Sequence, residues 1–409
     1  MKSSYGKWLL ALLWVVYVLS FIDRQIVAVL GVPIRMEFDL TNVQIGLLYG
    51  TAFSLVYAFA GIPMGRLADR WSHRWMIAIG LFTWSMVTVL SGFATSFTAL
   101  IVFRMILGVS QAMLSPAAYA VLADSFPAEK RSFVFSVYAS AIFAGVGFSF
   151  LGGGALALHY DWRIAMIAVG IPGLILAPFV WLFIRETEKK EVKPSPFISE
   201  TLAHIRFILK KRTVQLHLMG FSALACLGYS VLAFISTILT DVFERPDLVR
   251  HYGWFIFGVS GTVLIAGYVA DRLAKVAKPR RFYIGIFAAL VCLPLYAIGL
   301  FHSDATTALI LLGCAVLISS CYNGVGAALI QHFVTTDMRA LAGGIYLFTI
   351  NIAGFGLGPP LTGWLMDTVY SGKYAPSMAL MSVILGCSIV STLSFYYAMK
   401  TYKNDAFDS

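Results

Sequence analysis

Long apolar segments recur along the whole chain, and they limit what it can fold into more than any other feature. Hydrophobic residues make up 59% of the 409 residues and charged residues only 12%, whereas soluble domains carry about 25% charged residues. A helix of about 20 apolar residues crosses a hydrocarbon core of ~30 Å. We therefore predict an all-α membrane protein with twelve transmembrane helices. They are expected at residues 8–30, 43–64, 74–94, 97–121, 132–156, 163–184, 213–239, 252–271, 281–301, 305–330, 339–364 and 375–399.

A degraded repeat divides the chain into halves. The decapeptide GRLADRWSHR at 65–74 returns as GYVADRLAKV at 267–276, so that the offset is close to half of the chain. The segments PAEKR at 127–131 and TTDMR at 335–339 form a second pair, each followed by a glycine-rich apolar run. Repeats in the same orientation are expected for two bundles related by an axis along the membrane normal. We predict two pseudo-symmetric six-helix bundles.

The widest gap between apolar segments, residues 185–212, carries eight basic residues and two prolines. It predicts the domain organisation. We expect an N-terminal six-helix bundle over 1–184, a cytoplasmic central loop over 185–212, a C-terminal bundle over 213–399 and a cytoplasmic tail over 400–409. Within the loop, residues 197–209 fit either an amphipathic helix on the lipid headgroups or a solvated linker.

The positive charges are distributed unevenly between the two sides of the predicted helices. Of the 30 lysines and arginines, 23 fall on one side, five on the other and two inside helices. The positive-inside rule assigns the basic side and both termini to the cytoplasm. This bias also explains the net charge of +10 without a nucleic-acid partner. We predict a multi-pass protein of the bacterial inner membrane.

Three charged residues lie inside predicted helices, where charge is costly and its default role is functional. Asp23 and Arg104 both lie about 10 Å below the outer surface at 1.5 Å per residue, within reach of each other. Arg24 directly follows Asp23 in the sequence. Gln111 and Ser115 continue the helical face of Arg104. These residues predict a polar site in the first bundle, and a structural salt bridge between Asp23 and Arg104 is the alternative.

The pattern G-x-L-A-D-R between the second and third helices resembles the signature loop of the major facilitator superfamily. The resemblance implies an inner-gate latch made by Gly65, Asp69, Arg70 and Arg339. The Asp69 carboxylate would meet the amide end of the helix that begins near Arg339. Ordinary topology signals are the alternative reading of the arginines.

The segments FIDRQIVAVLGVPI and RMILGVSQAMLSPAAYAVLADSFPAEKR resemble the spinster-type branch of that superfamily and are similar to its organic-anion symporter branch. The resemblance implies that Asp23 carries a proton-linked charge, that Arg104 is the opposite charge for it, and that Arg24 contacts the substrate anion. Gln111 stands where those branches usually have an acid. Either Asp23 alone carries the proton, or transport is uncoupled.

The second half has weakly polar candidates in place of charges, and interhelical hydrogen bonding is the alternative role for each. The predicted substrate-binding set is Arg24, Arg104, Gln111, Ser115, Tyr322, Asn323 and Asn351. A charged side facing a weakly polar, aromatic one suits an amphipathic or organic anion. A lysolipid or sphingoid-like molecule fits, and so does a small carboxylate or a sugar acid.

These features predict a secondary active transporter that works by alternating access, coupled to protons as a symporter or antiporter. An uncoupled facilitator and a transporter-like membrane sensor are the alternatives. No phosphate loop occurs, and the seven histidines and five cysteines do not form metal-ligand spacings. We therefore expect no enzyme activity, no metal and no cofactor, with the proton gradient as the energy source of a monomer in the bilayer.

Overall fold

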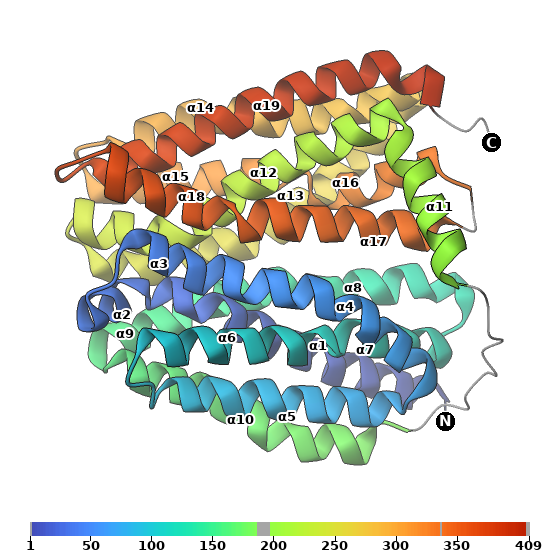
Figure 1. Ribbon diagram of the computed structural model, residues 1–409, viewed down its shortest axis with the longest axis horizontal. Coiled ribbons are helices and arrows are strands. Elements are labelled where there is room, and N and C mark those ends of the chain that lie inside the picture. The colour runs from blue at the N-terminus through green and yellow to red at the C-terminus, as the bar shows by residue number, and fades with distance from the viewer. Residues whose placement is uncertain (1, 186–196, 336–337, 406–409) are drawn as a thin grey trace. The chain divides into compact units, whose positions relative to one another are not determined.

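The computed structural model describes residues 2–185, 197–335 and 338–405, and these residues are almost entirely helical (Figure 1). They contain twelve helices that are long and apolar enough to cross a membrane. The spans confirm the predicted all-α membrane fold. They are Tyr5–Val29, Asn42–Ala68, His73–Ser91, Phe97–Ser125, Glu129–His159, Trp162–Phe183, Arg212–Val242, Pro246–Val276, Lys278–Leu300, Ala305–Phe333, Leu341–Val369 and Ala375–Lys403.

The chain forms two compact units. The first contains all elements up to α10, together with Pro246–Trp254, which includes η4 (Pro246–Leu248). Its other elements are α1 (Lys2–Val29), α2 (Gly31–Phe38), α3 (Asn42–Gly46), η1 (Leu47–Thr51), α4 (Ala52–Arg70), α5 (His73–Ser91), α6 (Phe97–Ala112), α7 (Leu114–Ser125), α8 (Ala128–Phe148), η2 (Ser149–Gly153), α9 (Gly154–His159) and α10 (Trp162–Phe183).

The second unit contains α11, α12 and the chain from Phe255 onward. Its elements are α11 (Phe197–Lys210), α12 (Arg212–Thr237), η3 (Ile238–Val242), α13 (Val249–Val276, whose first residues belong to the first unit), η5 (Lys278–Phe282), α14 (Tyr283–Leu300), α15 (Ala305–Ser319), α16 (Asn323–Leu329), η6 (Ile330–Phe333), α17 (Arg339–Thr349), η8 (Ile350–Gly356), α18 (Gly358–Trp364), η9 (Leu365–Val369) and α19 (Ala375–Asp405).

Two predicted boundaries look different in the structure. The stretch predicted as an amphipathic helix or a linker forms α11, which packs on α12 and α17 of its own unit. The predicted tail continues α19 as helix to Asp405, while 186–196 of the central loop and 406–409 of the tail lie outside the described residues.

The Asp405 carboxylate accepts a 2.7 Å hydrogen bond from the Thr213 amide. It thereby satisfies one of the unpaired N–H groups in the first turn of α12.

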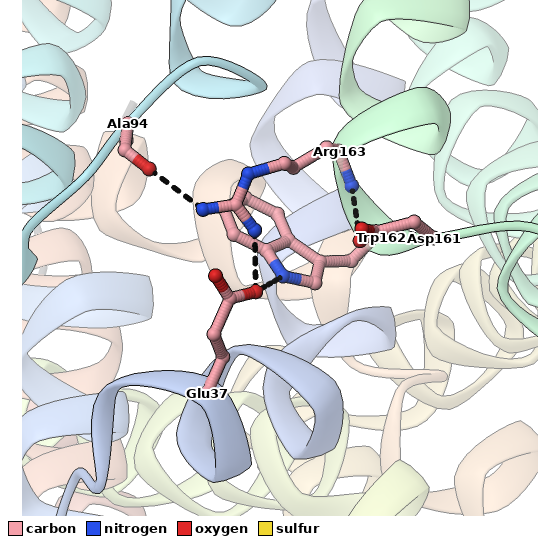
Figure 2. Close-up of polar contacts among 5 residues, drawn as sticks. All are labelled: Glu37, Ala94, Asp161, Trp162 and Arg163. Atoms are coloured by element: carbon pink, nitrogen blue, oxygen red, sulfur yellow. Dashed lines mark hydrogen bonds and ion pairs between the residues drawn. The ribbon is translucent and has the colours of Figure 1, made fainter.

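Each unit also has polar contacts that join its connecting segments and helix ends on the predicted outer side. In the first unit the Glu37 carboxylate accepts hydrogen bonds from the Trp162 indole, at 2.5 Å, and from the Arg163 guanidinium (Figure 2). The same guanidinium donates to the Ala94 carbonyl at 3.0 Å. In the second unit the Lys373 ammonium donates to the Glu244 carboxylate at 2.6 Å.

These contacts change the acidity of the groups involved. The hydrogen bond from Arg163 lowers the pKa of Glu37. Lys373 lowers the pKa of Glu244, and Glu244 in turn raises the pKa of Lys373. Two of the five basic residues predicted on the outer side, Arg163 and Lys373, therefore have acidic partners.

Candidate functional site

Arg24 lies in a box of aromatic rings inside the first unit. Its guanidinium carbon is 4.4 Å from the ring centroid of Phe21, 4.5 Å from that of Phe53 and 4.8 Å from that of Tyr57. The side chain is only 8% exposed. Its Nη2 donates to Gln111 Oε1 at 3.2 Å, and its buried Nε has no hydrogen-bond partner among the described residues. Cation–π contacts hold the charge in place, and the Nε–H group is left without a partner among the described residues.

Gln111 on α6 uses both ends of its amide. The Oε1 atom accepts from Arg24, and Nε2 donates to the Ser20 carbonyl of α1 at 3.0 Å. The neutral side chain therefore links α6 to α1 through one acceptor and one donor. A carboxylate at this position would have no N–H to offer to the Ser20 carbonyl.

Arg104 on α6 binds main-chain oxygens of two other segments. Its Nη1 donates to the carbonyl of Asp23 at 3.1 Å, and its Nη2 donates to that of Arg24 at 2.8 Å. Its Nε donates to the carbonyl of Leu48 at 3.2 Å, and Nη2 also donates to that of Tyr49 at 3.1 Å. Both latter carbonyls belong to the π-helical turn η1. The guanidinium therefore joins α1, η1 and α6 in a place that is 4% exposed.

The Asp23 carboxylate does not form the salt bridge with Arg104 that its depth suggested. The guanidinium binds the main-chain oxygen of Asp23, and the carboxyl group lies instead beside Thr88 and Trp84 of α5. Its Oδ1 is buried without a hydrogen-bond partner in the described part of the chain. The physical reason is competition, because four of the five N–H groups of Arg104 already point at carbonyls.

A cluster of tyrosines, which are not among the residues predicted from the sequence, extends the site. The rings of Tyr17 and Tyr138 stack with centroids 4.4 Å apart, and Tyr119 meets Tyr138 edge-on at 5.3 Å. The Tyr57 hydroxyl is near enough to influence the other three electrostatically, and Ser115 lies near the Tyr17 hydroxyl. We call Tyr17, Tyr57, Tyr119 and Tyr138 the tyrosine cluster. The sequence contains a signal for Tyr17, which precedes Arg24 by two helical turns and so shares its helical face.

The predicted site residues of the second unit bond mainly within their own segments. The Asn323 amide donates to the Ser320 carbonyl at 2.7 Å, and the Asn351 amide donates to the Leu347 carbonyl at 2.8 Å. Tyr322 is buried, with its ring centroid 5.5 Å from that of Phe221. These contacts suit helix packing, and a role in binding stays a prediction.

His217 on α12 is a buried polar residue that the sequence analysis did not identify. Its side chain is 0% exposed, and both ring nitrogens lack hydrogen-bond partners among the described residues. Its ring centroid lies 4.7 Å from that of Phe221, 5.5 Å from that of Tyr346 and 6.0 Å from that of Phe282. The signal was a single histidine in an apolar run, QLHLMGF.

The residues of the predicted latch fall in both units. Gly65 and Arg70 lie in the last turns of α4, with the arginine exposed, and Arg339 is exposed at the start of α17. The Asp69 side chain lies outside the described residues. In the second copy of the motif, the Asp271 carboxylate accepts a 3.1 Å hydrogen bond from Arg281. The latch therefore stays a prediction.

Comparisons with known proteins agree with this architecture. The chain is 29% identical to an MFS-type efflux pump of Mycolicibacterium smegmatis, over 95% of this chain and 91% of the relative. It is 27% identical to a probable L-galactonate transporter of Escherichia coli, over 96% and 89% of the two chains. A bacterial homologue of the human lysosomal transporter spinster, solved in an inward-facing, unoccupied conformation, has the same fold, with a TM-score of 0.87, 22% identity and 99% coverage of both chains.

These relatives confirm the resemblance to the spinster and organic-anion branches. The profile of the family described as Major Facilitator Superfamily matches residues 13–355. That match covers well over half of the chain, which therefore belongs to the Major Facilitator Superfamily.

Proposed function

We propose that this transporter carries an organic anion, with Arg24 as the anion contact and Asp23 as the proton carrier. The observation that carries the proposal is the state of Arg24. It is a buried cation held by three rings and one neutral amide, and its Nε–H group has no hydrogen-bond partner within the described part of the chain. A buried charge without an acidic partner is costly, and a bound carboxylate would supply that partner.

Proton coupling is supported by the surroundings of Asp23. The carboxyl group is 2% exposed and forms no ion pair with Arg104. Burial without an ion pair disfavours the charged form of this carboxyl group. Binding of a charged substrate nearby changes the same balance, so that substrate binding and protonation of Asp23 affect each other. Because Gln111 cannot titrate, Asp23 is the one carboxyl group in this proposal.

The tyrosine cluster favours a hydroxylated acid as the substrate. Tyrosine hydroxyls donate and accept hydrogen bonds, and the buried Tyr138 hydroxyl has no partner among the described residues. The E. coli relative is named as a transporter of a sugar acid. An amphipathic anion such as a lysolipid is the second candidate, because the apolar rings of Phe21 and Phe53 adjoin the cation.

The test is uptake by the purified full-length protein in proteoliposomes under an imposed proton gradient, with calorimetric binding in parallel. L-galactonate, uncharged galactitol and lysophosphatidylglycerol are the three ligands. Arg24→Gln is expected to weaken binding of the acid by about 30-fold, the equivalent of ~2 kcal/mol for a charged hydrogen bond. Binding of galactitol should change little. Arg206→Gln, at an exposed position of α11, is the matched control.

The outcomes separate the candidates. Preference for L-galactonate supports the hydroxylated acid, and preference for the lysolipid supports the amphipathic anion. If Arg24→Gln binds and transports every anion as well as the unmodified protein does, the assignment of Arg24 is wrong.

A further inference from the structure

Arg104 reaches no acidic side chain in the described residues, although it lies next to one. The bonds from its guanidinium that the structure records all end on main-chain carbonyls, two in α1 and two in η1. A side chain that contacts a substrate anion needs N–H groups directed at the ligand, and here four of five are occupied. Its geometry is that of a clamp between two backbones.

The location of the clamp gives it a specific effect. One carbonyl that it holds belongs to Arg24 itself, and the next belongs to Asp23. The π turn that it holds leads into α4, which supplies Phe53 and Tyr57 to the aromatic box. Arg104 therefore holds the main chain from which the Arg24 side chain extends. It also holds the turn that leads to two of the rings around the Arg24 guanidinium.

Two further contacts keep the same segments in place. The Tyr49 hydroxyl of η1 donates to Gln25 Oε1 of α1 at 2.8 Å. A Cβ atom added to Gly108, one turn after Arg104, would lie 2.9 Å from the Phe53 carbonyl. Glycine there permits the close approach of α6 to α4 that lets the guanidinium reach the π turn.

We propose that Arg104 is a positioning residue for the anion site: it holds α1 against the π turn so that Arg24 points into its aromatic box, and Arg24 alone contacts the anion. This inference rests on the proposed function, because it assigns Arg104 a role through Arg24. It departs from the sequence-based expectation that Arg104 binds substrate and pairs with the Asp23 carboxylate.

A double-mutant cycle tests whether Arg104 acts through Arg24. Binding of L-galactonate is measured by calorimetry for the unmodified protein, Arg24→Gln, Arg104→Gln and the double variant. Arg104→Gln is expected to weaken binding about tenfold on its own and less than about twofold in the Arg24→Gln background, since residues that share one interaction are not additive. Equal effects in both backgrounds would overturn the proposal, because they would mean that Arg104 contacts the anion independently.

Hydrogen exchange tests the clamp without any ligand. Arg104→Gln is expected to raise amide exchange by about tenfold in peptides that cover 20–30 and 45–55, because these segments lose their shared guanidinium. Arg104→Lys, which keeps the charge but offers a single ammonium point, should show most of this increase and serves if Arg104→Gln does not fold. Arg206→Gln should leave both segments unchanged.

The two measurements separate the possible failures. Unchanged exchange in the Arg104 variants contradicts the clamp, whatever the binding results are. Raised exchange with no effect of Arg104→Gln on binding shows a purely structural role and also overturns the positioning proposal. If Arg24→Gln itself leaves binding unchanged, the proposed anion contact fails first, and the positioning role falls with it.

Discussion

The two units share a scaffold but differ in what they bury. In the first unit Asp23, Arg24 and Arg104 are all buried, and among the side chains that the structure describes no other Asp, Glu, Lys or Arg is buried. At the core of the second unit lies His217, which is surrounded by rings and whose ring nitrogens have no hydrogen-bond partner in the described structure. One unit therefore concentrates groups that can bind and exchange charge, and the other keeps an apolar, aromatic interior.

On the predicted outer side the two units are alike, because each has an ion pair between an acidic and a basic side chain. Glu37 with Arg163 and Glu244 with Lys373 each join the segment after the first span of a half to the segment at or just before the start of its last span. The outer ion pairs are therefore duplicated between the units, and the buried charges are not. Energy coupling is expected to follow the buried charges, so that variants in the two units should have unequal effects.

The largest effect is expected at Asp23. Asp23→Asn removes the titratable group and should reduce proton-driven accumulation of L-galactonate in proteoliposomes to the passive level. Exchange of labelled for unlabelled substrate should continue, because the neutral amide imitates the protonated acid. The measurement is uptake with and without an imposed pH gradient. Uphill uptake that matches the unmodified protein would remove Asp23 from the coupling mechanism.

A smaller effect, and one of opposite sign, is expected at His217. Burying a polar group without a hydrogen bond costs about 1–3 kcal/mol. His217→Leu should therefore keep or raise the melting temperature, by as much as about 2–4 °C per kcal/mol recovered in a unit of this size. Uptake should be unchanged, and Phe221→Leu in the same core serves as the packing control. A loss of proton-driven uptake with normal stability would show that the second unit also contributes to coupling.

The smallest effects are expected at the outer ion pairs, which are partly or largely exposed. Glu37→Gln should lower the melting temperature slightly, by about 1–2 °C, and more than Glu244→Gln does. Glu37 also binds Trp162, and its side chain is 39% exposed against 73% for Glu244.

The difference in melting temperature between Glu37→Gln and the unmodified protein should depend on pH with a definite sign. The fold lowers the pKa of Glu37. The stabilisation of the folded protein by ionised Glu37 is therefore fully present above the ordinary glutamate pKa of about 4.3, and it is lost as the pH falls through the lowered pKa. Melting curves of Glu37→Gln and the unmodified protein should therefore converge in acid. A gap that widens below pH 4 would contradict this assignment.

The fold could be predicted from the sequence, because the apolar segments are long and the charges between them are strongly biased. Two segments differ in detail: residues 197–210 form a separate helix before α12, and α19 continues as helix from the apolar run through 400–405. The structure also brings Asp23, Arg24, Arg104 and Gln111 together, as helical spacing and depth suggested.

The atomic partners could not be predicted in the same way. Spacing gives the depth of Arg104, but the π turn that offers it two carbonyls depends on how α1, α4 and α6 pack. The tyrosine cluster was missed for a similar reason, since its members come from four different spans and no single helix face contains them.

The contacts of Arg104 have a consequence for reading the evolution of this site. All four recorded acceptors are main-chain oxygens, and every amino acid supplies the same carbonyl. Substitutions at Leu48 or Tyr49 would therefore leave the acceptors present, and no compensating change at position 104 would be required. These bonds therefore impose no correlated substitutions at the acceptor positions, so that methods which infer proximity from such substitutions would not detect these four bonds.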